Sequence, residues 1–372
     1  MKVFSLIILI LIALGGIGYW YYDSLQTPNN PVEYIENSTE GQLEVSEAPL
    51  VEVIAKNLTV PWEILFLPDG ELLVTERPGR ILLLRSGQTI EVEGVEHVGE
   101  GGLLGAALHP NFNENKLLYL YQTTRTENGL RNRVVRYELT GAELQLDRVI
   151  LDNLPGAQYH DGGRIAFGPD GFLYVALGDA LNEPAAQNTE NLAGSILRVT
   201  VDGEVPTDNP FSNEIYSYGH RNPQGLVWDV SGNLWSSEHG RSGARSGFDE
   251  INLIERGGNY GWPQYEGDEV ASGINGPQRH SGASDTWAPG GIAYLNGSLF
   301  MPGLRGETLY EAVLSDTEII EWREHFVGEY GRLRTVQVGP DGLLYLLTSN
   351  RDGRGLPDSE DDRIIRINPE RL

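Results

Sequence analysis

The sequence predicts an all-β fold, a single six-bladed β-propeller that follows an N-terminal membrane anchor or signal segment. Short apolar runs alternate with turn residues along the chain, and 46 of its 372 residues are glycine. One hairpin formula returns six times after residue 50, at a spacing of roughly 40 to 65 residues, which is typical of a propeller. Each such unit leaves its sheet edges open until neighbours pack against it, so we expect the units to close into a ring.

Each repeat consists of an apolar strand, a turn, a second apolar strand and a third strand that ends near an arginine. The turns include Pro68-Asp69-Gly70 in the first repeat and Pro340-Asp341-Gly342 in the sixth, and such residues favour tight hairpins. Residues 51–58 precede the first full repeat, so we expect them to supply the outer strand of the last blade. The repeats cover residues 62–82, 104–137, 159–198, 225–252, 291–310 and 335–367.

Two segments precede the propeller, which we expect to occupy residues 50–372. Residues 3–22 contain no charge and are long enough to span a bilayer, and the aromatic cluster that ends this run suits a membrane interface. We expect residues 1–22 to be a retained anchor, with the rest of the chain exported to the periplasm or the cell surface. A cleaved signal peptide is the alternative. Residues 23–49 are polar and without periodicity, so we expect a linker there.

The composition excludes several classes of partner and chemistry. Asp and Glu outnumber Lys and Arg by 53 to 27, which gives a net charge of −26. Nucleic-acid backbones and anionic lipid surfaces need a cationic footprint, so the charge argues against both. The sequence contains no cysteine, which excludes disulfides, thiolate metal sites and cysteine nucleophiles.

The most informative stretch is residues 159–179, YHDGGRIAFGPDGFLYVALGD. His160 lies in a glycine-bearing loop before one strand of a predicted hairpin, and Asp179 follows the other strand. A hairpin brings its two ends together, so both side chains should lie on one rim. A histidine that a carboxylate orients is a usual arrangement for a general base. The alternative is a loop histidine and a turn aspartate that never meet.

Arginines occupy comparable positions in the later repeats. Arg221, in the motif GHRNPQG, stands before the inner strand of the fourth repeat, as His160 does in the third. Arg305, Arg332 and Arg334 share this placement in the fifth and sixth repeats. Guanidinium groups pair with carboxylates through two hydrogen bonds, so the cluster predicts an anionic ligand such as a polycarboxylate. The alternative is that Arg221 braces the contact between blades.

Five motifs, in this order, closely resemble those of the soluble aldose sugar dehydrogenases, the PQQ-dependent glucose dehydrogenase family. They are GEGGLLGAALHP at 99–110, the stretch 159–179, GHRNPQG at 219–225, SSEHG at 236–240 and DEINLIERGGNYGWP at 249–263. The resemblance implies an enzyme that uses PQQ and a calcium ion to oxidise the anomeric carbon of aldose sugars to lactones. It also implies an external electron acceptor, such as a quinone or a cytochrome.

The resemblance implies roles for particular residues. His160 would remove the proton of the anomeric hydroxyl, and Asp179 would orient the histidine. Arg221 would polarise the quinone carbonyl that receives the hydride. The residues implied to bind the cofactor are Glu100, Tyr159, His160, Arg221, Asn222, Arg305, Arg332 and Arg334.

The resemblance also implies a metal site. The backbone carbonyls of Gly240 and Arg241 would hold calcium, an ion that prefers oxygen ligands and acts as a Lewis acid. Some positions depart from the family pattern: Glu100 stands where some members carry glutamine, Arg305 where some carry lysine, and Arg241 where the family has proline. These departures bear on substrate preference.

Two other classes of function occur on the same fold. A calcium-dependent lactonase or esterase would need acidic and asparagine ligands that converge in the channel, whereas the predicted rim residues are mostly basic. A non-catalytic binding propeller is compatible with the fold alone, but it would have no reason to pair His160 with Asp179 beside an arginine cluster. We expect a monomer or a homodimer.

Overall fold

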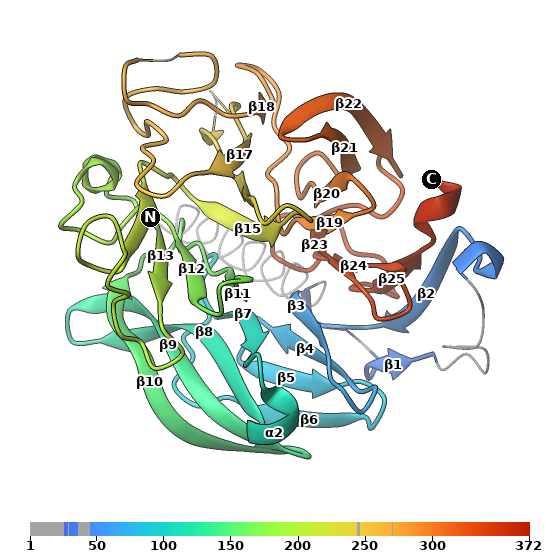
Figure 1. Cartoon of the computed structure of the whole chain (residues 1–372). Coiled ribbons are helices and arrows are strands. Elements are labelled where there is room, and N and C mark those ends of the chain that lie inside the picture. Colours follow the sequence, from blue (N-terminus) through green and yellow to red (C-terminus); the bar gives the residue numbers. More distant parts are fainter. Residues whose placement is uncertain (1–25, 29, 36–44, 244–245, 270) are drawn as a thin grey trace, which may run out of the picture.

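The computed structural model describes residues 26–28, 30–35, 45–243, 246–269 and 271–372. Within these residues the strands form six antiparallel sheets arranged radially around a central axis, which confirms the predicted six-bladed β-propeller (Figure 1). The predicted anchor at residues 3–22 lies outside the described residues. Among the helices that the structure describes, none is long and apolar enough to cross a membrane.

The first five blades each contain four strands that are consecutive in the sequence, and the first strand of each is the innermost. Blades 1 to 3 consist of β3 (Pro61–Phe66), β4 (Leu72–Glu76), β5 (Arg80–Leu83) and β6 (Gln88–Glu91); β7 (Leu103–Leu108), β8 (Leu117–Thr126), β9 (Gly129–Thr140) and β10 (Glu143–Pro155); and β11 (Ile165–Phe167), β12 (Leu173–Leu177), β13 (Ser195–Val199) and β14 (Ile215–Tyr218). Blades 4 and 5 consist of β15 (Pro223–Trp228), β16 (Leu234–Glu238), β17 (Glu250–Ile254) and β18 (Arg279–His280); and β19 (Ala293–Leu295), β20 (Ser298–Pro302), β21 (Leu309–Ser315) and β22 (Glu318–His325).

Blade 6 closes the ring with strands from both ends of the propeller. Its strands, from the axis outward, are β23 (Leu333–Val338), β24 (Leu344–Thr348), β25 (Ile364–Ile367), β2 (Val51–Lys56) and β1 (Glu33–Tyr34). Val51 of β2 pairs with Ile367 of β25, which confirms that residues 51–58 contribute the outer strand after β25. The inner strands β23 and β3 are in contact, so the last blade meets the first.

Part of the segment predicted as a linker packs against blade 6. In β1, Glu33 pairs with Lys56 of β2, so β1 covers an edge that would otherwise be open. The short 3-10 helix η1 (Val45–Glu47) lies against the C-terminal end of the chain, where the side-chain amide of Asn368 donates to the carbonyls of Val45 at 2.7 Å and Ala48 at 2.8 Å. These residues therefore differ from the structureless linker that composition predicts.

Six hydrophobic clusters form the core, and each fills the space between two neighbouring blades. Strand β12 shows how the sequence produces this arrangement. Leu173, Val175 and Leu177 point toward blade 2, whereas Tyr174 and Ala176 point toward blade 4. A strand that is buried on both faces is apolar throughout rather than alternating. This explains the continuous apolar runs in the second strand of the repeats.

The repeated Pro-Asp-Gly turns connect the first and second strands of their blades. They lie at the end of the propeller opposite to the one at which the inner strands begin. In blade 3, Asp170 accepts hydrogen bonds from Phe172 N at 3.3 Å and from the Tyr174 hydroxyl at 3.0 Å. Asp341 makes the corresponding bonds in blade 6. The glycine that follows has a φ of 79° in blade 3 and 77° in blade 6, a left-handed conformation that favours glycine.

Helices are few and short among the described residues, in line with the sequence pattern. They are α2 (Phe112–Asn115) and the 3-10 helices η1, η2 (Glu183–Gln187) and η4 (Pro369–Arg371). In an antiparallel blade, the start of the first strand and the end of the second lie at the same end. His160, Arg221 and Arg332 precede inner strands, whereas Gly240 and Arg305 follow second strands. The fold therefore brings these residues to one end of the channel.

Candidate active site

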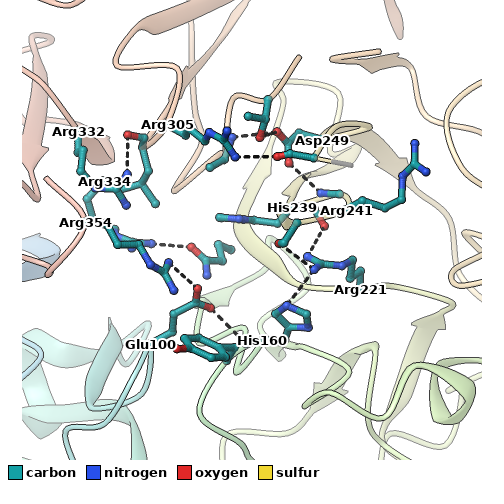
Figure 2. Close-up of a pocket in the computed structure, with 18 of the residues that line it drawn as sticks. Glu100, His160, Arg221, His239, Arg241, Asp249, Arg305, Arg332, Arg334 and Arg354 are labelled. Carbon is teal, nitrogen blue, oxygen red and sulfur yellow. Dashed lines mark hydrogen bonds and ion pairs between the residues drawn. The ribbon is translucent and has the colours of Figure 1, made fainter. Parts of the chain in front are cut away.

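The end of the channel at which the inner strands begin contains a cavity of about 480 Å³. Figure 2 shows the side chains of several blades converging on it. The residues predicted from the sequence line this cavity, except Asp179 and Asn222. The predicted lining residues are Glu100, Tyr159, His160, Arg221, Gly240, Arg241, Arg305, Arg332 and Arg334.

His160 and Asp179 meet as the hairpin geometry predicts. Nδ1 of His160 lies 2.8 Å from Oδ1 of Asp179, which is fully buried behind the ring. On the other side of the ring, Nη2 of Arg221 donates to Nε2 of His160 at 2.9 Å. A guanidinium can only donate, so Nε2 is the acceptor and the proton of the neutral ring lies on Nδ1, toward Asp179. The imidazole thus presents an unprotonated nitrogen to the cavity.

The backbone around His160 is shaped to bring the hairpin ends together. His160 has a φ of 63°, which is uncommon for a residue other than glycine and is often found at functional sites. A Cβ atom on Gly178 would lie 2.0 Å from the carbonyl oxygen of His160, so only glycine allows this approach. Asp179 is held in turn by Trp262, whose Nε1 donates to Oδ2 at 2.9 Å. The pair is therefore rigidly placed.

Arg334 is a buried guanidinium without a carboxylate partner among the described residues. Its Nη1 donates to Oε1 of Gln224 at 2.5 Å, and its Nε has no hydrogen-bond partner. Burial, together with the positive charge of Arg77, lowers the pKa of Arg334 to about 9. A buried, unpaired charge is costly, so an anion in the cavity would be stabilised there.

Arg332 also lines the cavity, but its charge is already compensated. Its Nε and Nη2 both donate to Oδ2 of Asp352, at 3.0 and 2.7 Å, and its Nη1 donates to the carbonyl of Leu304 at 3.0 Å. Arg332 therefore offers less uncompensated positive charge to the cavity than Arg334 does. Arg305 is exposed at the rim, where its Nη1 donates to Oγ of Ser246 at 2.7 Å.

Glu100 connects the loop of His160 with an arginine that sequence reasoning missed. Oε2 of Glu100 accepts from the backbone N of His160 at 3.2 Å, and Oε1 accepts from Nη1 of Arg354 at 2.8 Å. The Arg354 guanidinium also lies over the ring of Tyr159, 5.4 Å from its centre. Although burial opposes ionisation, the positive charge of Arg354 and the backbone N–H of His160 lower the pKa of Glu100 to about 2.

The carbonyls predicted to hold calcium lie on the loop after β16. The Arg241 carbonyl accepts from the backbone N of Gly247 at 3.2 Å and keeps a second lone pair. Asp249 fixes this loop, since its Oδ1 accepts from Gly240 N at 2.8 Å and its Oδ2 accepts from Ala288 N at 2.9 Å. The Arg241 side chain turns away to pair with Glu266 at 3.1 Å.

Asn222 does not line the cavity. It is 1 % exposed, and its Oδ1 accepts from Gly162 N at 2.9 Å, so it supports the loop after His160 from behind. Cavity residues that were not predicted include Arg354, His239 and Asp249. His239 and Asp249 lie within motifs already recognised, SSEHG and DEINLIERGGNYGWP, so those motifs carried a signal for both. Arg354 lies outside all five motifs.

Comparisons with known proteins identify the family of this chain. A sequence model of the glucose/sorbosone dehydrogenase family matches residues 58–357. An aldose sugar dehydrogenase of Escherichia coli is 32% identical over 342 residues, which cover 82% of this chain and 91% of that protein. The PQQ-bound structure of an aldose sugar dehydrogenase from Streptomyces coelicolor is 41% identical, with a TM-score of 0.78 over 85% of this chain and 97% of the other.

A second solved structure is also similar to this chain. A crystal structure described as a putative oxidoreductase (glucose dehydrogenase), from a Thermus species, is 47% identical to this chain, with a TM-score of 0.81. The match covers 85% of this chain and 98% of that one. The family match spans most of the propeller, including every residue that lines the cavity. The chain therefore belongs to the glucose/sorbosone dehydrogenase family.

Proposed function

We propose that this protein is a PQQ-dependent dehydrogenase that oxidises aldose sugars at the anomeric carbon to lactones and passes the electrons to an external acceptor, such as a quinone or a cytochrome. The family and the PQQ-bound relative support this function. It is favoured over a lactonase or a binding propeller because the family is one of dehydrogenases. The observation that carries the proposal is the buried guanidinium of Arg334, which faces the cavity without a carboxylate partner among the described residues.

The residues of the cavity fit a planar polycarboxylate such as PQQ. Arg334 and Arg305 offer guanidinium N–H groups that no described carboxylate occupies, and charge-assisted bonds to carboxylates are among the strongest in proteins. Arg221 lies beside His160 and is 5 % exposed. When bound, PQQ would supply the quinone that accepts the hydride from the sugar. The protein would supply position, charge and a base.

His160 is proposed as the base. Its Nε2 faces the cavity as an acceptor, so it can take the proton from a C1 hydroxyl that approaches within hydrogen-bond distance. Asp179 would then stabilise the imidazolium through the 2.8 Å contact to Nδ1 and keep the ring from rotating. Arg221, already positioned next to Nε2, would place positive charge where negative charge develops on the oxygen atoms.

We propose a calcium ion at the carbonyls of Gly240 and Arg241. Among the described residues, no group of three or more histidine or acidic side chains is placed to hold a metal. Calcium takes about six to eight oxygen ligands, so two carbonyls can supply only part of its shell. The remaining ligands would come from water and from oxygen atoms of the cofactor. We therefore expect calcium and PQQ to increase each other's affinity.

The experiment is a titration of the purified, cofactor-free protein with PQQ, with and without calcium, while the reduction of a dye by several aldoses is followed. We expect saturable activity that requires PQQ and that appears at lower PQQ concentration when calcium is present. Gas chromatography of the product should show a lactone or its hydrolysed acid. Absence of PQQ-dependent sugar oxidation under these conditions would overturn the proposal.

A further inference from the structure

The six arginines that line the cavity fall into two groups. Three of them form an ion pair with a carboxylate: Arg241 with Glu266 at 3.1 Å, Arg332 with Asp352 at 2.7 Å and Arg354 with Glu100 at 2.8 Å. For Arg221, Arg305 and Arg334, no ion pair with a described carboxylate is formed. The uncompensated positive charge of the cavity therefore belongs to the second group, which faces the proposed cofactor.

The Glu100–Arg354 pair differs from the other two pairs in the position of its carboxylate. Asp352 and Glu266 compensate their arginines from outside the cavity, whereas Glu100 itself lines it. Glu100 also contacts the backbone of the proposed base, through the bond from His160 N at 3.2 Å. The pair thus forms the wall beside His160, where a sugar must lie to present its C1 hydroxyl (Figure 2).

We propose that the Glu100–Arg354 pair is a specificity element that restricts the site to neutral aldoses and excludes sugars that carry a carboxylate, such as uronic acids. The proposal rests on the function proposed above. Arg354 alone would attract an anionic sugar, because its side chain is 49% exposed at the rim and carries a guanidinium fork suited to carboxylates. Glu100 cancels that charge, so the pair offers no net positive charge to the carboxylate of a sugar.

The contacts of Glu100 keep its carboxylate ionised across the working pH range, so the pair excludes anionic sugars throughout that range. Both carboxylate oxygens of Glu100 accept a hydrogen bond, one from Arg354 and one from His160 N. These contacts lower the pKa of Glu100 to about 2, although burial opposes ionisation. An anionic sugar would have to lose its hydration beside an ion pair that gives its carboxylate no net attraction, and the remaining free arginines would already be paired with the cofactor. Like charges placed together in an interface cost affinity.

The test compares glucose with glucuronate as substrates of the PQQ-loaded protein. Glu100→Gln keeps an amide oxygen that can accept from His160 N, but it leaves the charge of Arg354 uncompensated. We expect the ratio of kcat/KM for glucuronate to that for glucose to rise by about tenfold or more. Adding Arg354→Met to this variant should abolish the gain. Glu96→Gln, which breaks an ion pair with Arg125 outside the cavity lining, is the matched control.

The affinity for PQQ, measured by quenching of tryptophan fluorescence, provides a readout that does not depend on activity. The resemblance implies that Glu100 binds the cofactor, but both of its carboxylate oxygens already accept hydrogen bonds from Arg354 and His160 N. We therefore expect the PQQ Kd of Glu100→Gln to stay within about threefold of the wild-type value. An unchanged substrate ratio in Glu100→Gln would overturn the proposal, as would a gain that persists without Arg354. A large change in PQQ Kd with an unchanged ratio would place the pair on the cofactor side instead. A wild-type protein that oxidises no aldose with PQQ would overturn the proposed function, and this proposal with it.

Discussion

Arg221 and His160 share a hydrogen bond in which Nη2 donates to Nε2 over 2.9 Å. The lone pair of Nε2 that accepts this bond is also the one that would take the proton from the sugar. A sugar hydroxyl must therefore displace the N–H of Arg221 or share the lone pair with it. Arg221 keeps other contacts when this happens, since the same nitrogen also donates to Oγ of Ser242 at 3.0 Å. Arg221 thus orients the imidazole ring of His160, and a sugar hydroxyl can still reach Nε2.

Replacement of the proposed base should separate chemistry from binding. We expect His160→Ala to lower turnover by at least about a hundredfold, the scale of a lost general base, with little change in PQQ affinity. Asp179→Asn should fall between this variant and the wild type, because it disturbs the ring orientation only. Steady-state kinetics with a PQQ titration measures both quantities. His109→Ala is the control, because His109 follows β7 at the end of the propeller opposite to the cavity. Near-normal turnover of folded His160→Ala would rule out His160 as the base.

Arg334 and Arg332 should respond to substitution in opposite ways. Arg334→Met removes an unpaired buried charge, so we expect the PQQ affinity to fall by roughly thirty- to several-thousand-fold, equivalent to about 2 to 5 kcal/mol, while Tm is unchanged or higher. Arg332→Met leaves Asp352, whose side chain is 3% exposed, without its partner, so we expect a loss of about 3 to 5 kcal/mol in unfolding free energy.

Calorimetry and a PQQ titration on the same preparations would test this division of roles. Addition of Asp352→Asn to Arg332→Met should restore part of the stability, because it removes the buried charge that was left unpaired. If Arg334→Met lowers Tm and keeps full PQQ affinity, the anion-binding role of Arg334 is wrong.

Asp362 should make stability depend on pH. Its side chain is fully buried and accepts from Val60 N at 3.3 Å, at the junction between blades 6 and 1. Burial and the neighbouring charge of Asp361 raise its pKa from 3.8 to about 7. Between these values the folded state holds a proton that the unfolded state has lost, so this contribution to stability falls as pH rises from about 4 to about 7.

Asp362→Asn should remove this contribution. The difference in unfolding free energy between wild type and variant should fall by up to about 1.4 kcal/mol per pH unit in that window and level off above it. Urea denaturation at a series of pH values measures the difference, and Asp316→Asn, at an exposed position, is the control. A difference that stays constant from pH 4 to 8 would show that Asp362 remains ionised in the fold.

The uncharged run at residues 3–22 leads us to propose that the chain is exported and anchored in a membrane. We expect the full-length protein to sediment with membranes and a form that begins at residue 31 to remain in the supernatant and active. A form that begins at residue 50 would lose β1 and η1, so it should melt at a lower temperature. Recovery of the full-length product in the soluble fraction, with a new N-terminus roughly at residues 15 to 25, would instead show a cleaved signal.

The sequence predicted the parts of the site that depend on local geometry. His160 and Asp179 terminate the two strands of one hairpin, so their meeting follows from the turn between them. Asn222 lies behind the loop of His160 and not in the cavity lining, because neighbouring residues of an extended segment point to opposite sides and Arg221 takes the side of the cavity. Arg354 could not be found, because it lies on the long loop between β24 and β25. The path of that loop depends on contacts such as the one with Glu100, which is more than two hundred residues away in sequence.

The pairing of β2 with β25 has a consequence for how the molecule is made. Val51 lies in β2, ahead of all five complete blades in the sequence, yet its partner Ile367 is more than three hundred residues further along the chain. Blades 1 to 5 can form in order from neighbouring segments, but β2 must wait until β25 has been synthesised. Contacts this distant in sequence are formed slowly. A chain that lacks only the residues from β25 onward would therefore keep most of its sheets and still fail to close the ring.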